Sequence, residues 1–358
     1  MRALIRLDMA TVMSLFGTSE WLLFGLWVFA LVWPITYAIR HRTSLALSIT
    51  VGLLLAYLVQ VICQFAYANG WVGGWLWWDF VLVPNRISGL SWFHTFFSAG
   101  FLHSQSNATH VLGNILVIAL VGVPLEQRLG TRRFALVYGI GLFGGSFAWF
   151  LFNSTSNNPS LGASGAAFGL FGAYLAGWPK DEIPFPLILI RKWPVLYIAL
   201  FYFAMEVFRA YTTLGLNQAS DVAHMAHLGG FLATYLLLPV IAKNGPYPLG
   251  IEDGGPTSSS GERSRLNQIR SVMVDMSITV DPWTARDMEI PRAIRDPLRS
   301  LLASADEPET RLAWMEHLAD AAECPDCQAP LGVVERRSGP QLQCSIEPEH
   351  LNWPESDS

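Results

Sequence analysis

Seven apolar stretches, each close to the length of a membrane-crossing helix, constrain this chain more than any other feature. A helix needs about 20 predominantly apolar residues to cross a bilayer. The stretches are residues 20–39, 45–67, 107–125, 134–153, 162–178, 193–209 and 222–242. They predict an all-α polytopic membrane protein with seven spans. Residues 162–178 are rich in Gly and Ala rather than Leu, which favours packing inside the bundle over contact with lipid.

Charge divides the chain into two parts. Only 14% of the residues are charged, against about 25% in ordinary soluble proteins. Residues 1–250 hold 13 Lys and Arg against 8 Asp and Glu, whereas residues 251–358 hold 10 against 20. The net charges of +5 and −10 predict a membrane domain followed by a water-soluble one. The overall net charge of −5 argues against nucleic acid as a partner.

The basic residues near the spans predict the orientation, because cytoplasmic loops carry an excess of Lys and Arg. With the N-terminus outside, nine basic residues lie on the inner side: Arg40, Arg42, Arg128, Arg132, Arg133, Lys180, Arg191, Lys192 and Lys243. Four lie on the outer side: Arg2, Arg6, Arg86 and Arg209. We therefore expect the N-terminus outside and the C-terminal tail in the cytosol. Residues 68–106 then form an outer loop, whose many Trp residues favour the headgroup region of the bilayer.

Three groups of polar residues lie within the spans, where their cost suggests function. His110 and Asn114 are four apart and share one helix face. Ser164 lies in Gly-Ala-Ser-Gly at the start of the fifth span, and His227 in Ala-His-Leu-Gly-Gly of the seventh. Each group alone has a structural explanation, since a Ser often bonds its own backbone and His or Asn can join two helices. In the predicted orientation, however, all three lie near the outer ends of their spans and can converge.

Together these groups supply the parts of a serine hydrolase. A Ser hydroxyl is a weak nucleophile that needs a base, and neutral His serves near pH 7. A His ring N–H and an Asn amide can stabilise an oxyanion, and Ser164 begins a helix, where free N–H groups favour negative charge. Gly162 and Gly165 would let a substrate backbone approach closely. No carboxylate lies within one turn of His227, and Asp221 is six residues away, so we expect a Ser–His dyad rather than a triad.

A metal site is the competing interpretation of the last span. His224 and His227 are three residues apart and could face one site, as metal ligands do. Asp221 and Glu206 are weak candidates for a third ligand. An intramembrane metalloprotease is therefore a minor alternative, and we interpret His224 as a supporting polar residue.

Three motifs, in this order and on these spans, resemble the rhomboid family of intramembrane serine proteases: His110-x-x-x-Asn114, Gly-Ala-Ser164-Gly and Ala-His227-x-x-Gly. Residues 125–130, Leu-Glu-Gln-Arg-Leu-Gly, also look like the family's loop after its second core span. The resemblance covers residues 45–243 and implies a six-helix core. Residues 1–44 would add one extra N-terminal helix.

The resemblance implies a role for each residue of the site. Ser164 would be the nucleophile and His227 the general base, and His110, Asn114 and the Ser164 backbone N–H would form the oxyanion hole. Phe168 takes the position of an aromatic residue that stacks on the catalytic His in relatives. The supporting residues are Gly162, Gly165, Phe168 and Gly230. The implied reaction is cleavage of transmembrane segments of single-span membrane proteins in the lipid bilayer, with no cofactor for catalysis.

Three positions depart from the family's pattern. Trp92 is followed by Phe93, where family members often carry Arg. His103 precedes His110 by seven residues, although a spacing of five is common in the family. Thr234 stands where a second packing Gly would be usual and predicts a slightly wider or differently packed helix contact. None of these departures removes a catalytic group.

The tail has its own organisation. Residues 244–262 are rich in Gly, Pro and Ser and predict a flexible linker. Residues 263–358 predict a soluble tail with helices over 263–277, 297–305 and 308–322.

Three Cys and one His near the C-terminus have the ligand types of a structural zinc site: Cys324, Cys327, Cys344 and His350. A zinc-ribbon-like end would staple a domain too small to be stable by its core alone. The alternatives are a thiol pair without metal and a disulfide, and a cytosolic setting disfavours the disulfide. The tail could bind a cytosolic partner.

The leading functional hypothesis is therefore an intramembrane serine protease. A second is a non-catalytic binder or chaperone of membrane proteins on the same fold, but such relatives generally lack the Ser or the His, and this chain has both. A transporter is a third, less favoured hypothesis, because the sequence shows no inverted repeat or pair of broken hydrophobic segments.

Overall fold

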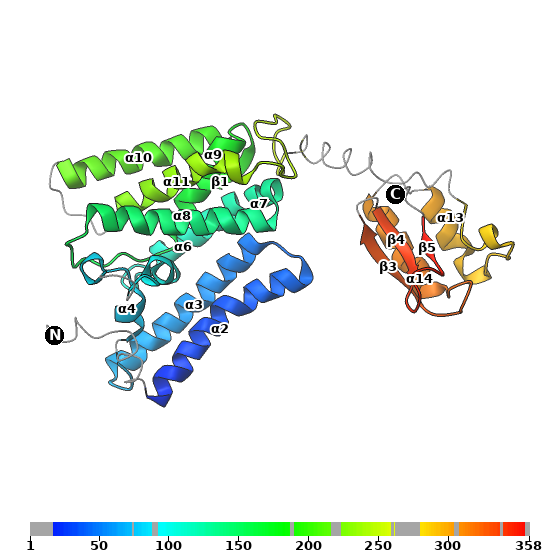
Figure 1. Ribbon diagram of the computed structural model, residues 1–358, viewed down its shortest axis with the longest axis horizontal. Coiled ribbons are helices and arrows are strands. Elements are labelled where there is room, and N and C mark those ends of the chain that lie inside the picture. The colour runs from blue at the N-terminus through cyan, green and yellow to red at the C-terminus, as the bar shows by residue number, and fades with distance from the viewer. Residues whose placement is uncertain are drawn as a thin grey trace. The chain divides into compact units, whose positions relative to one another are not determined.

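A computed structural model describes residues 17–73, 75–87, 92–186, 190–215, 223–258, 261, 280–303, 308–336 and 339–354. The chain divides into two compact units, Met1–Ser258 and Ser259–Ser358. The first is almost entirely helical, and the second mixes two helices with a small sheet (Figure 1).

Six helices of the described residues are long and apolar enough to cross a membrane. They are α2 (Thr18–His41), α3 (Leu45–Ala68), a continuous span Thr109–Leu129 made of α6 (Thr109–Val117), the π-helix η4 (Ile118–Gly122) and α7 (Val123–Leu129), then α8 (Thr131–Phe152), α10 (Val195–Gly215) and α11 (His224–Ile241). These helices start and end within a few residues of the predicted spans. The agreement arises because a helix that crosses the bilayer needs an uninterrupted run of about 20 apolar residues, which the sequence shows directly.

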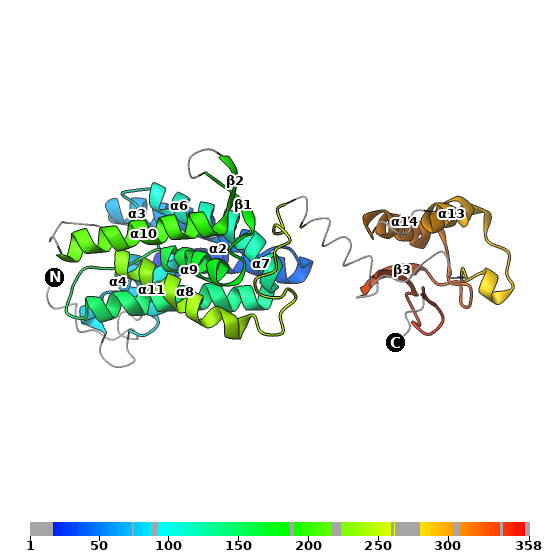
Figure 2. The same ribbon diagram turned by 90° about the horizontal axis from the view of Figure 1, so that it is seen from above.

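The fifth predicted span, residues 162–178, differs from the other six. It forms α9 (Ser164–Gly177), a helix of 14 residues of which 11 are buried. At 1.5 Å per residue such a helix is about 21 Å long, which is shorter than a hydrocarbon core of about 30 Å. Six helices of the described residues thus have the length of a full span, and α9 is a shorter, buried helix, as the Gly and Ala content of residues 162–178 predicted. Figure 2 shows α9 among the other helices of the bundle rather than at its edge.

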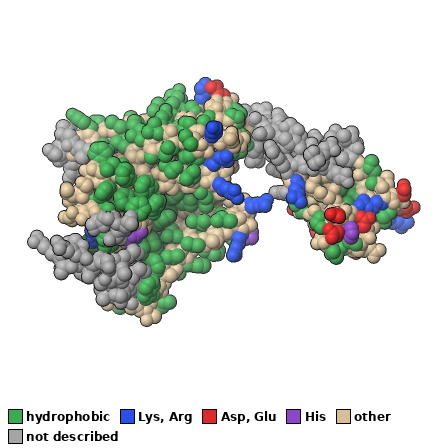
Figure 3. Space-filling model, in the orientation of Figure 1, with side chains coloured by type: hydrophobic (Ala, Val, Ile, Leu, Met, Phe, Trp, Pro, Cys, Tyr) green, Lys and Arg blue, Asp and Glu red, His purple; other side chains and the backbone are tan. Residues whose placement is uncertain are grey.

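Large apolar side chains cover the outside of the helical unit (Figure 3). Leu22 and Leu236 are each 70% exposed, and Val240 is 73% exposed. A soluble protein does not leave continuous apolar surface of this kind in water, so the unit is an integral, multi-pass membrane protein. Lys and Arg side chains gather at one end of the same unit in Figure 3.

Short elements fill the loop between α3 and α6. They are α4 (Trp75–Phe80), η2 (Pro84–Arg86), α5 (Thr95–Ser98) and η3 (Ala99–Phe101). Arg86 lies over the rings of Trp78 and Trp92, 5.3 Å and 5.5 Å from their centroids. Trp92 is followed by Phe93 in the sequence, but it contacts an Arg that lies six residues earlier in the chain. The position of this loop in the headgroup region stays a prediction.

Residues 125–130 tie together the opposite end of the bundle. Glu126 accepts hydrogen bonds from the backbone N–H groups of Leu45 (2.9 Å) and Ala46 (3.0 Å) and so caps the start of α3. The guanidinium of Arg128, 1% exposed, donates two hydrogen bonds of 2.8 Å to Asp181, which follows α9. This segment therefore fixes α3 and the end of α9 in one polar cluster.

The first part of the predicted linker joins this cluster. Asp253 pairs with Arg128, whose guanidinium holds the pKa of that carboxyl below its usual value. The N–H of Gly250 donates to the carbonyl of Gly177 at 2.7 Å. The described residues 244–258 thus pack on the helical unit, because charge pairing anchors a segment whose composition predicted flexibility. A hairpin of β1 (Glu182–Pro186) and β2 (Ile190–Pro194) lies between α9 and α10.

The second unit packs two helices on a three-stranded antiparallel sheet. The helices are α13 (Arg295–Ala303) and α14 (Pro308–Ala321), and the strands β3 (Leu331–Arg336), β4 (Gly339–Cys344) and β5 (Asn352–Trp353) lie in the order β3-β4-β5. The 3-10 turns η5 (Thr284–Arg286) and η6 (Arg292–Ile294) precede the helices. The helices predicted over 297–305 and 308–322 correspond to α13 and α14, and the helix predicted over 263–277 lies outside the described residues.

Candidate active site

The site begins where the chain enters α9. Gly162 has φ of +114°, a conformation that side chains rarely allow. A Cβ atom placed on it would lie 2.7 Å from the ring of His110 and 3.6 Å from Nδ2 of Asn114. The two predicted oxyanion residues therefore lie directly against the turn that precedes Ser164. Asn114 Nδ2 is buried and has no hydrogen-bond partner in the described part of the chain.

His103 supports the same turn. Its side chain is fully buried, its ring lies 5.4 Å from that of His110, and its Nε2 accepts a hydrogen bond of 3.3 Å from the N–H of Ala163. A His that accepts at Nε2 is neutral. The unusual spacing to His110 therefore still places His103 beside the turn that precedes Ser164.

Small residues bring three helices into backbone contact beside Ser164. A Cβ on Gly145 of α8 would lie 2.8 Å from the carbonyl oxygen of Ala226 and 2.9 Å from Cα of Gly165. A Cβ on Gly230 of α11 would overlap the carbonyl oxygen of Gly165. The Gly residues of both motifs thus set the distance between the helix of Ser164 and the helix of His227.

Thr234 lies in the same contact. Its side chain is fully buried, and its hydroxyl donates a hydrogen bond of 2.6 Å to the carbonyl of Gly169 on α9. The sequence predicted a slightly wider or differently packed contact, and this interhelical hydrogen bond is a packing that a second Gly could not make.

Phe168 links the two predicted catalytic residues. It lies one turn after Ser164 on the same helix face, and its ring stacks on that of His227 with centroids 4.3 Å apart and planes inclined by 8°. Ser164 and His227 are each 8% exposed. The face of α9 that carries Ser164 and Phe168 is therefore turned toward the imidazole of His227 on α11.

An acidic side chain from a third helix meets the same imidazole. Oε2 of Glu206, on α10, lies 2.9 Å from Nδ1 of His227 and 2.7 Å from Nδ1 of His224. Glu206 is 2% exposed. From the sequence we predicted Glu206 only as a weak candidate for a metal ligand. Its position on a different span gave no sign that it would meet His227. The signal that could have found it is a lone acid in an otherwise apolar span. Asp221, the nearest acid along the chain, lies outside the described residues.

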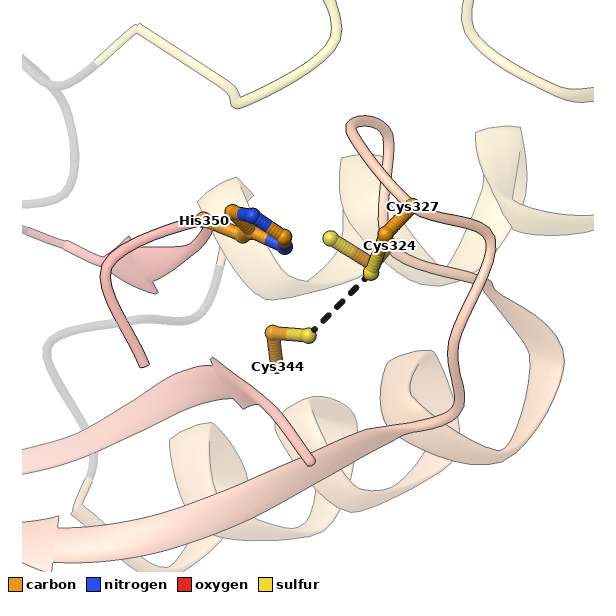
Figure 4. A group of neighbouring side chains, drawn as sticks. All are labelled: Cys324, Cys327, Cys344 and His350. Atoms are coloured by element: carbon orange, nitrogen blue, oxygen red, sulfur yellow. Dashed lines mark hydrogen bonds between the residues drawn. The ribbon is translucent and has the colours of Figure 1, made fainter. Parts of the chain in front are cut away.

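The second unit holds a separate cluster of metal-binding side chains (Figure 4). One ligand atom each of Cys324, Cys327, Cys344 and His350 lies within 4.8 Å of the other three. All three thiols are free, Sγ of Cys327 is 3.5 Å from Sγ of Cys344, and Nδ1 of His350 is buried without a partner among the described residues. The set fits a tetrahedral zinc ion, which takes Cys and His ligands in this number.

Comparison with known proteins shows that the part of the chain holding the helical site is similar to a known domain. The Rhomboid domain matches residues 91–244. RHOMBOID-like protein 1 of Arabidopsis thaliana is 36% identical over 141 residues, which are 39% of this chain and 32% of the relative. Rhomboid-related protein 1 of Caenorhabditis elegans is 29% identical over 194 residues (50% of this chain, 51% of the relative). Rhomboid-related protein 3 of Homo sapiens is 30% identical over 152 residues (40% and 36%).

The matched part of the chain spans between 32% and 51% of the length of these three relatives. The region 91–244 contains both predicted catalytic residues, both oxyanion residues and Glu206. The helices α2 and α3 and the Cys cluster of the second unit lie outside it.

Proposed function

Since the chain belongs to the rhomboid family, we propose that it is an intramembrane serine endopeptidase that cleaves transmembrane segments of other membrane proteins. The observation that carries the proposal is the stacking of His227 on Phe168 at 4.3 Å, one turn after Ser164. This contact supports the proposal, because it holds the ring of His227 against the helix face that carries Ser164.

The reaction follows from the residues at the site. Nε2 of His227 removes the proton of the Ser164 hydroxyl, and Oγ attacks the carbonyl carbon of the scissile peptide bond. The same proton then passes from Nε2 to the nitrogen of the leaving amine as the C–N bond breaks. A water molecule, deprotonated by His227, hydrolyses the acyl-enzyme and regenerates the hydroxyl.

The oxyanion would be stabilised by groups that already face the turn before α9. The N–H of Ser164 lies at the start of the helix α9, where backbone donors and the dipole favour negative charge. Asn114 Nδ2 is a buried donor with no partner in the described part of the protein, which suits a group that bonds only when charge develops. The His110 ring lies against Gly162 beside it.

The substrate is a single-span membrane protein that reaches the site from the bilayer. We place the N-terminus outside and the C-terminal unit in the cytosol, as the distribution of basic residues favours. The clustering of Lys and Arg at one end of the helical unit (Figure 3) supports this orientation. The cleavage site then lies toward the outer face of the membrane.

Purified full chain in liposomes, given a single-span reporter, tests the proposal. Wild type should cleave the reporter, and Ser164→Ala and His227→Ala should both be silent. Cleavage by either variant would reject the assigned nucleophile or base. Retention of an uncut reporter by wild type would instead favour the non-catalytic binder.

In the second unit we propose a structural zinc ion held by Cys324, Cys327, Cys344 and His350. Four protein ligands leave no open position, so the ion would stabilise the fold and supply no catalysis. Elemental analysis should give one zinc per chain in wild type and less in Cys344→Ser. A metal-free wild type with the unit fully folded would reject the site.

A further inference from the structure

Glu206 is the one acidic residue of the helix α10, and its burial needs an explanation. It is 2% exposed in a segment, Val195–Thr213, that is long and apolar enough to span a membrane. A carboxylate buried at such a place is costly unless it is paired. Its partners therefore indicate why it is there.

Both carboxylate oxygens of Glu206 have partners. Oε1 lies 3.3 Å from the guanidinium of Arg209, one turn later on α10. Oε2 is 2.7 Å from Nδ1 of His224, a hydrogen bond, and 2.9 Å from Nδ1 of His227. Arg209 and His224 thus hold the carboxylate in place, and the oxygen so fixed faces the ring that Phe168 stacks on.

We infer that Glu206 is a positioning residue that orients His227 for catalysis, so that the site works with three residues instead of two. The inference rests on the proposed protease function. A carboxylate at Nδ1 keeps the proton on that nitrogen, which leaves Nε2 free to accept the proton of Ser164. It also stabilises the imidazolium that forms during attack, while itself remaining ionised.

The contact between Glu206 and His227 is close but is not an aligned hydrogen bond. Nδ1 of His227 lies 2.9 Å from Oε2 of Glu206 and has no hydrogen-bond partner among the described residues. Catalytic hydrogen bonds are often poorly aligned without substrate and tighten in the Michaelis complex. The aligned bond to His224 holds Glu206 until then.

A metal ion at Glu206, His224 and His227 is the other interpretation of this cluster, whose ligand atoms lie within 4.8 Å of one another. A tetrahedral zinc ion separates its N and O ligands by about 3.4 Å, given bond lengths of about 2.1 Å. The observed 2.7 Å between His224 and Glu206 is a direct hydrogen-bond distance. The cluster therefore favours a proton-bound arrangement.

The first test compares two identical substitutions of buried carboxylates, Glu206→Gln and Glu126→Gln, in the full chain in liposomes. Glu206→Gln should lower kcat by about 100-fold, within the range that general-base catalysis contributes, and leave KM unchanged, since Glu206 does not touch substrate. Glu126→Gln, at the opposite end of the bundle, should leave kcat per folded molecule unchanged. Equal kcat in wild type and Glu206→Gln would overturn the inference. A metal ion that Cys344→Ser still binds, and that is lost when Glu206→Gln is added, would favour the metal and overturn the inference.

The second test does not depend on cleavage. In ¹⁵N-histidine-labelled protein, with His227→Ala used for assignment, His227 should be protonated at Nδ1 in wild type. Glu206→Leu, which suits an apolar span, should give a mixture of tautomers. An unchanged tautomer would reject the link between Glu206 and His227. A wild type that shows the tautomer but never cleaves any reporter would instead reject the protease function and leave the link intact.

Discussion

The two ends of α9 both carry buried polar groups, but they treat them in opposite ways. At the anchored end, formed by Glu126, Arg128, Asp181 and Asp253, the carboxylates and the guanidinium bond to one another or to helix N–H groups. At the site end, near Ser164, Asn114 Nδ2 has no partner among the described residues. The first arrangement is that of a structural network. The second leaves a hydrogen-bond donor available for a substrate group.

The difference teaches which polar residues of a membrane bundle are there for stability. A satisfied network holds helices together, and its loss is measured in the free energy of unfolding. An unsatisfied buried donor lowers stability and is retained where it contributes to chemistry. Substitutions at the two ends should therefore separate stability from activity.

The largest effect should come from Arg128→Met at the anchored end. Removing the guanidinium leaves the carboxylate of Asp181, 1% exposed, without its charge partner, and breaking a buried pair in this way costs about 3–5 kcal/mol. Denaturation in detergent should show this loss, while kcat per folded molecule stays the same. A comparable fall in kcat would remove the distinction between the two ends.

Asn114→Ala should do the reverse at the site end. Loss of one oxyanion donor lowers kcat by about 10²–10³-fold, or about 2.7–4 kcal/mol in the barrier. The midpoint of unfolding should change little, because the lost donor had no partner to leave behind. Reporter cleavage and thermal unfolding, measured on the same preparation, decide it; a destabilised protein with normal kcat would assign Asn114 to structure.

Gly230→Ala should show an intermediate effect. The added Cβ would overlap the carbonyl oxygen of Gly165 and lie 2.8 Å from that of Gly141, and overpacking of this kind costs about 1–3 kcal/mol. Gly139→Ala is the matched control, since nothing lies within 4 Å of its added Cβ. Unfolding in detergent should rank Gly230→Ala below wild type and Gly139→Ala at or above it. The opposite ranking would contradict the close packing of α9 on α11.

The smallest effect is a pH dependence at the anchored end. Arg128 lowers the pKa of Asp253 in the folded protein, so the pair contributes stability above the unfolded pKa of about 4 and loses it as the pH falls further. Asp253→Asn should remove this part of the acid-induced loss and leave the unfolding midpoint at neutral pH slightly lower. An unfolding midpoint that falls by the same amount in variant and wild type, as the pH is lowered from neutral through the pKa of Asp253, would show that the pair does not couple to stability.

The spans and most of the candidate site could be predicted because each depends on residues that are close together in the sequence. Apolar length predicts α2, α3, α8 and α11 to within a few residues, and the motifs around Ser164 and His227 each lie on one element. The family resemblance, confirmed by the Rhomboid domain match, supplied the order in which they combine.

What the sequence did not predict depends on contacts between elements. Glu206 meets His227 only because α10 packs beside α11, and no spacing along the chain expresses that. The same holds for Arg86 with Trp92 and for Arg128 with Asp253. Residues 162–178 were predicted as a span to within two residues of α9, but the positive φ of Gly162 before the helix could not be predicted from the spacing.

The chain that follows α11 forms hydrogen bonds with the C-terminal end of α9 and with α7 before it reaches residue 258. Gly250 bonds to Gly177, Trp178 donates to the carbonyl of Pro248 at 2.9 Å, and Arg128 pairs with Asp253. A force applied to the chain beyond residue 258 would therefore act on these hydrogen bonds before it acted on α11. Such a load would therefore reach Arg128 on α7 and the C-terminal end of α9 before it reached the helix that carries His227.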